Sequence, residues 1–193
     1  MKKWLVIAIL GVGIFFTTIS SYNGLVQARE NVNAVWAKVE SQYQRRADLI
    51  PNLVNTVKGQ ANFEQETLTK VIDARAKATQ IRLDPANLTA ENLQAFQQQQ
   101  NAVGSALSRL LVTVERYPEL KANEGFLTLQ AQLEGTENRI TVARNNFNDV
   151  ARGYNQKIHS FPNILIAKLF GFQEKPYFSA SAGAEIAPTV TFN

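Results

Sequence analysis

The side chains that could carry out chemistry in this 193-residue sequence are few, and their spacing suits none of the common reactions. Glu64 and Glu66 are two residues apart, so on a helix their carboxylates point in different directions. Glu134 and Glu137 are three apart and share a helix face, but no Glu-x-x-His pair accompanies them, as a di-metal carboxylate bundle requires. The sequence has no cysteine, which excludes a thiol nucleophile and a cysteine-ligated zinc site. Its one histidine, His159, does not favour a serine–histidine triad or a histidine-ligated metal site. No nucleotide-binding glycine motif or HExxH motif occurs either, and we predict no catalytic, metal or cofactor site and no enzymatic activity.

The densest cluster of charge is Arg45, Arg46 and Asp48. Its simplest role is helix capping and surface ion pairing, which contributes about 0–1 kcal/mol per exposed pair. The alternative role is contact with a partner protein or a lipid headgroup. Lysines and arginines elsewhere are dispersed among acids, so the net charge of +4 does not indicate a nucleic-acid partner. The candidate partner-contact or structural network comprises Arg45, Arg46, Asp48, Glu134, Glu137 and Arg139.

The N-terminus has the pattern of a membrane anchor. Lys2 and Lys3 precede an uncharged, strongly apolar run over residues 4–19, which is about 24 Å long as a helix. Continuing to residue 26 gives a segment long enough to cross a membrane. We predict an uncleaved anchor over residues 1–26 in contact with membrane lipid, with cleavage after Ser20 as the alternative. The two lysines favour a cytoplasmic N-terminus and an extracytoplasmic body.

Beyond the anchor, apolar residues recur at steps of three and four, which predicts long amphipathic helices. We expect a first break near residues 46–48, with Asp48 capping a second helix that has Pro51 in its first turn and runs to residue 81. Pro85 breaks the chain again, Thr89 caps a third helix, and a fourth follows Pro118. The first of these helices exposes an apolar stripe that we expect to be available for self-association: Val32, Val35, Trp36 and Val39.

These helices predict an all-α fold: an N-terminal transmembrane helix followed by an elongated, roughly four-helix antiparallel bundle with coiled-coil-like packing over residues 27–172. Gln100 and Thr136 interrupt the apolar seams, either as buried polar groups or at a seam edge. The apolar segment 163–172 predicts a short C-terminal helix, which either closes one end of the bundle or offers a patch to the membrane surface or another subunit. Residues 173–193 form an extended or disordered tail.

Several strings resemble the LemA family. They are YNGLV at 22–26, RRADLIPNLVNTVKG at 45–59, LKANEGFLTLQAQLEGTENRI at 120–140, then Asn148, Tyr154-Asn155 and Phe161-Pro162. The resemblance implies a bacterial membrane protein with an N-terminal anchor and a helical bundle, and no established enzymatic activity. Some members resemble lipoproteins with a cysteine just before the YNGLV string; this sequence has Ser21 there, so lipid attachment is excluded.

Together these features favour a membrane-anchored, non-catalytic scaffold or interaction protein of the bacterial cell envelope. We expect it to lie in the cytoplasmic (inner) membrane, to pass through it once and to form a homo-oligomer. The resemblance also implies a partner: family members are often encoded near membrane metalloproteases or TPM-domain proteins, which suggests a membrane protease or another envelope protein. The alternative function is that of a regulatory adaptor or sensor that binds and modulates a membrane protease.

Overall fold

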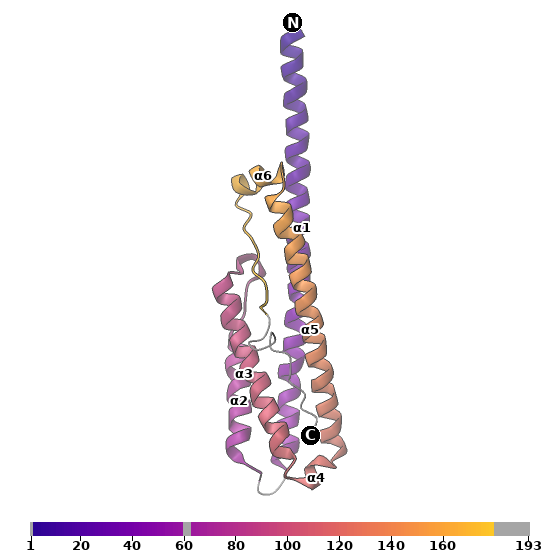
Figure 1. Ribbon diagram of the computed structural model, residues 1–193, viewed down its shortest axis with the longest axis vertical. Coiled ribbons are helices and arrows are strands. Elements are labelled where there is room, and N and C mark those ends of the chain that lie inside the picture. The colour runs from indigo at the N-terminus through magenta and orange to yellow at the C-terminus, as the bar shows by residue number, and fades with distance from the viewer. Residues whose placement is uncertain (1, 60–62, 180–193) are drawn as a thin grey trace, which may run out of the picture.

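A computed structural model describes residues 2–59 and 63–179, and within these ranges the regular structure is entirely helical (Figure 1). In chain order the helices are α1 (Lys2–Lys58), α2 (Gln65–Gln80), the short 3₁₀ helix η1 (Pro85–Asn87), α3 (Ala90–Val114), α4 (Pro118–Lys121), α5 (Glu124–His159) and α6 (Asn163–Phe170). The helices α1, α2, α3 and α5 alternate in direction and form an elongated bundle, from one end of which α1 projects alone. The predicted all-α fold with a long apolar N-terminal helix is confirmed.

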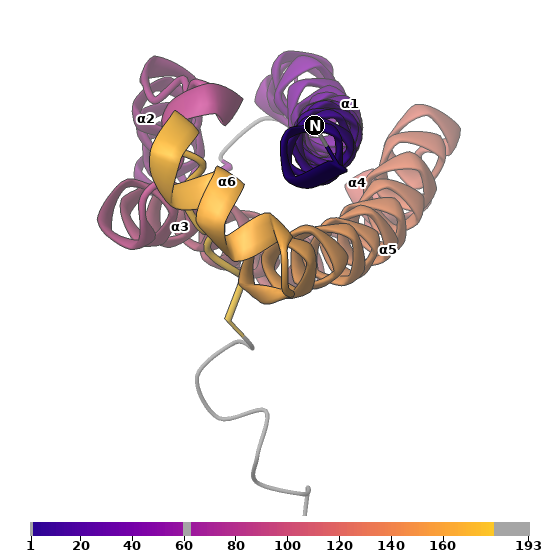
Figure 2. The ribbon, with the colours of Figure 1, turned by 90° about the horizontal axis from the view of Figure 1, so that it is seen from above.

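The bundle is built from two helix pairs. Helix α5 lies along α1 over most of the length of the body, and α2 packs against α3 as a hairpin. Helix α2 also contacts α1, whereas α6 lies across the end from which α1 projects (Figure 2). The two longest helices, α1 and α5, therefore run the length of the body, and the α2–α3 hairpin packs against one side of this pair.

The predicted break at residues 46–48 is wrong, because α1 continues through Asp48 and Pro51 to Lys58. Proline has no amide hydrogen, so the carbonyl of Ala47, four residues earlier, loses its helical donor. Arg75 of α2 replaces that donor: its Nε lies 2.7 Å from the Ala47 oxygen. The chain instead leaves the helix at Gly59, whose amide donates to the Asn55 carbonyl, and α2 begins at Gln65.

The starts of two later helices follow from their caps. Thr89 caps α3, as predicted, and forms a reciprocal capping box with Asn92. Asn123 caps α5 by accepting a hydrogen bond from the Phe126 amide at 3.0 Å. Both caps satisfy amides that have no partner inside their helix.

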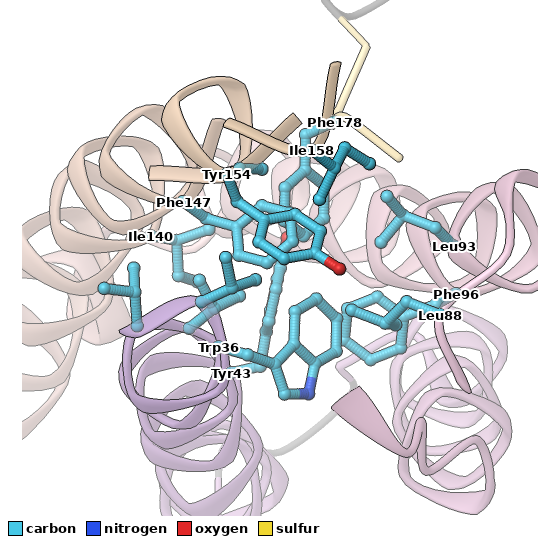
Figure 3. Close-up of a cluster of buried hydrophobic side chains, with 14 of the residues drawn as sticks. Trp36, Tyr43, Leu88, Leu93, Phe96, Ile140, Phe147, Tyr154, Ile158 and Phe178 are labelled. Atoms are coloured by element: carbon cyan, nitrogen blue, oxygen red, sulfur yellow. The ribbon is translucent and has the colours of Figure 1, made fainter. Parts of the chain in front are cut away.

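The stripe expected to serve self-association lies inside the single chain. Val32, Val35, Trp36 and Val39 are all buried, so the expectation that they form an exposed surface is corrected. Figure 3 shows Trp36 among side chains from α3, α5 and the segment after α6. The physical reason is that α5 lies along α1 and covers its apolar face.

The segment after α6 packs against the bundle. Residues 173–179, which we call the strap, run in extended conformation back along the bundle, and Lys175 and Phe178 are buried there. The tail predicted for residues 173–193 is thus packed where the structure describes it, and residues 180–193 lie outside the described residues. The polar seam residues Gln100 and Thr136 are also buried.

Candidate functional site

The most conspicuous polar arrangement in the body is centred on Arg46 of α1, whose side chain is only 4% exposed. Its Nη1 lies 2.6 Å from Glu137 Oε1 on α5. Its Nη2 donates to both the backbone oxygen of Gln100, at 2.9 Å, and the side-chain Oε1 of Gln100, at 2.6 Å, on α3. The guanidinium also lies 5.2 Å from the centre of the Tyr43 ring. One arginine therefore ties α1, α3 and α5 together and fixes their register.

The six residues of the predicted network are not one cluster. Arg46 and Glu137 are brought together, but the other members are exposed, and three of them bond within their own helices. Asp48 accepts from Gln44 and Glu134 accepts from Gln130. Arg139 donates to Thr136 at 3.2 Å, and Arg45 is exposed on α1. The network thus divides into a structural pair and exposed charges that face solvent: Arg45, Asp48, Glu134 and Arg139.

A groove of about 520 Å³ lies beside Arg46, between α1, α2 and α3. Its wall combines Glu40, Arg75 and Arg82 with the aromatic rings of Tyr43 and Phe96. Burial raises the pKa of Tyr43, although nearby Arg144 and Arg46 act in the opposite direction. Mixed charge of this kind can accept polar side chains of a partner. The groove does not place a nucleophilic side chain beside a general base. Within residues 2–59 and 63–179, no group of three His, Asp or Glu side chains could hold a metal ion.

The strap is held by two asparagines of α5 whose side chains form hydrogen bonds with its backbone. Asn148 donates to the Phe178 carbonyl at 2.9 Å and accepts from the Phe178 amide at 2.8 Å. Asn155 makes the same pair of bonds to Lys175, at 2.8 and 2.9 Å. Seven helical residues and three extended residues both span about 10 Å, so the two asparagine amides match the two strap positions. We call Asn148 and Asn155 the amide clamps.

Side chains of the strap complete its docking. Phe178 stacks on Trp36 at 5.9 Å between ring centres and meets Phe147 edge-on at 5.5 Å, while Arg144 covers its outer face at 4.9 Å. Lys175 donates from Nζ to the carbonyls of Pro85 and Ala86 in η1, at 2.7 and 3.0 Å. Burial lowers the pKa of Lys175. The strap therefore joins α5 to the loop between α2 and α3 across the core.

Comparison with known proteins identifies the family of this sequence. The family model described as "LemA family" matches residues 35–192. The chain belongs to the LemA family. It is 26% identical over 177 residues to "Protein LemA" of Metamycoplasma hominis, covering 90% of this chain and 76% of that protein. It is 27% identical over 209 residues to "Magnetosome protein MamQ" of Magnetospirillum gryphiswaldense, covering 99% of this chain and 76% of that protein.

Within this LemA family member, α1 is the one helix of the described residues long and apolar enough to cross a membrane. Its apolar side chains from Trp4 to Ile19 are exposed, because none of the other described helices packs on them. Family membership together with this exposed helix indicates a membrane-associated protein.

Sequence reasoning missed the amide clamps as functional residues, although Asn148 and Asn155 belong to the strings that resemble the family. An asparagine on a helix carries no local mark of its partner. The available signal was their spacing of seven, which places both on one helix face.

Proposed function

We propose that this protein is a membrane-anchored helical scaffold of the bacterial cell envelope that presents an extracytoplasmic body to partner proteins. The observation that carries the proposal is the continuity of α1, which begins as an exposed apolar helix and ends as one of the two long helices of the bundle. Because no hinge separates the two parts, the body is held on the membrane by a helix rather than by a flexible tether. Lys2 and Lys3 favour the orientation with the body outside.

A contact at the membrane end of the body supports this rigid connection. Lys157 of α5 donates from Nζ to the backbone oxygen of Gly24 at 2.8 Å, and Leu25 is fully buried. Tertiary packing therefore begins immediately after the apolar segment. A partner that binds the body meets it at a defined height and orientation above the membrane.

Self-association belongs to the proposal as a second part, but it must use surfaces other than the buried stripe around Trp36. The exposed charges of the predicted network and the groove between α1, α2 and α3 are such surfaces. The alternative role as regulator of a membrane protease depends on the same exposed charges, so one experiment bears on both.

The experiment is proximity labelling in cells with the full chain, followed by copurification of the labelled proteins. Arg45→Glu with Arg139→Glu reverses two exposed charges and leaves the buried Arg46 untouched. Arg109→Glu, on the exposed face of α3, is the matched control. We expect the double variant to remain folded and membrane-bound and to lose specific partners that the control retains.

Each of two results would overturn one part of the proposal. An unchanged set of copurified proteins in the double variant would exclude these charges as a contact surface. A reporter fused after residue 193 that is active only in the cytoplasm would exclude an extracytoplasmic body.

A further inference from the structure

Helix α6 lies across the end of the body from which α1 projects, as Figures 1 and 2 show from two directions. It is held there by aromatic contacts with α1. The Tyr22 ring lies 4.9 Å from the Phe170 ring and 5.8 Å from the Phe172 ring. The inward side of α6 is Ala167, which is buried against the bundle. Along the axis of α1, the C-terminal end of α6 therefore lies level with Tyr22.

The outward side of α6 is apolar, and no other part of residues 2–59 and 63–179 covers it. Leu165 and Leu169 are four residues apart on the helix and are 60% and 75% exposed, and Phe161, in the turn just before the helix, is 82% exposed. The only charge in the helix is Lys168. Gly171, with φ of 72°, ends α6 and turns the chain into the strap, and the Phe172 amide closes the turn on the Ala167 carbonyl at 2.9 Å. Both ends of α6 are thus fixed to the body with this side outward.

The position of α6 coincides with the expected edge of the hydrocarbon core. A core of about 30 Å takes about 20 helical residues, which from Trp4 reaches residue 23. Tyr22, and with it Phe170, then lies at the boundary, where aromatic rings are favoured. An apolar helix face carrying one lysine, placed crosswise at that level, has the pattern of an interfacial helix.

We propose that α6 is a membrane foot: its Leu165 and Leu169 side chains, together with Phe161 just before the helix, insert into the phospholipid interface beside α1. The proposal rests on the proposed function, because it takes α1 as membrane-spanning. The foot gives the body a second point of attachment, displaced sideways from the first. With two attachments the body resists tilting about the base of α1, which one helix alone does not ensure.

The absence of cysteine makes a direct test straightforward, because each introduced cysteine carries a unique spin label. The full chain is reconstituted in phospholipid nanodiscs with a label at Leu165→Cys or Leu169→Cys. Val112→Cys is the matched control, an exposed apolar position on α3. Leu10→Cys reports on the anchor. Collision of each label with oxygen, which enters lipid, is compared with collision with a water-soluble nickel chelate.

We expect the labels at Leu165 and Leu169 to collide preferentially with oxygen, as at Leu10, and the label at Val112 to collide preferentially with the nickel chelate. If Leu10 reports lipid while Leu165 and Leu169 report water, the foot is refuted and the anchor stands. Shielding of both α6 labels from both reagents would indicate cover by a second copy and would also refute the foot. A label in water at Leu10 would refute the proposed function itself. Circular dichroism melting of each variant checks that the fold is retained.

Discussion

Replacing Asn155 by alanine is expected to release the strap at Lys175. The side chain of Asn155 is buried and makes three hydrogen bonds: two to the backbone of Lys175 and one, at 2.8 Å, to the Tyr177 hydroxyl. Alanine leaves the amide and the carbonyl of Lys175 without these partners, at about 1–3 kcal/mol for each buried group. Because the strap can move to recover water, we expect a total loss of about 3 kcal/mol.

The matched comparison is Asn148→Ala, which removes two bonds to Phe178 at a half-buried position. Water can replace those bonds more easily, so we expect a loss of about 1 kcal/mol there. The assay is native-state hydrogen exchange of the Lys175 amide, together with urea unfolding. A loss of about 3 kcal/mol corresponds to about 100-fold less protection at Lys175.

Two results would contradict this reasoning. Equal losses for the two variants would show that burial does not set the strength of the clamps. Undiminished protection at Lys175 in Asn155→Ala would show that the asparagine does not hold the strap. In the second case the strap would be held without Asn155, by Asn148, Phe178 and the lysine contacts.

The Arg46 pair is expected to respond unequally to loss of each partner. Glu137→Ala leaves a buried charge without its counter-ion and should cost about 3 kcal/mol in urea unfolding. Arg46→Met leaves a carboxylate that is 45% exposed and a buried Gln100 side chain without its donor, and should cost about 2 kcal/mol. The reverse order would contradict that account. Phe178→Ala should cost about 3 kcal/mol by the same assay, because a buried aromatic ring is lost from the core; a cost under about 1 kcal/mol would show that the ring does not stabilise the body. Burial raises the pKa of Tyr43 and Tyr154 above 10.0, so the folded state keeps protons that the unfolded state releases, and stability should fall as pH rises above that value. Replacing both by phenylalanine should flatten this fall in urea titrations, and an unchanged slope would assign it to other groups.

The periodicity of the sequence predicts most of the helices because their apolar faces repeat locally. Thr89 and the break around Pro85 are predicted for the same reason: their signals lie within a few residues. The break near residues 46–48 is predicted because a proline such as Pro51 is typical of the first turn of a helix. The prediction is wrong because α1 continues through Pro51. The donor that lets α1 continue, Arg75, lies 28 residues away and cannot be identified from spacing.

The candidate site is predicted only in part, since it depends on contacts between distant segments. Arg46 and Glu137 are 91 residues apart in the sequence, and both appear in the predicted network without any sign that they pair. The apolar stripe around Trp36 is recognisable, but its cover comes from Phe147 and Phe178. A stripe that needs cover looks the same in sequence whether a second copy or the same chain supplies it.

The continuity of α1 couples the rotation of the body to that of the membrane segment. In an α-helix each residue advances the chain by about 100° around the axis, so the sequence between Tyr22 and Leu25 sets which side of the body faces a given side of the anchor. Inserting one residue there would rotate the groove and the exposed charges by about 100° around the α1 axis, relative to any protein bound to the anchor. Helical phase, and not only height, thus becomes a property that a partner in the membrane can recognise.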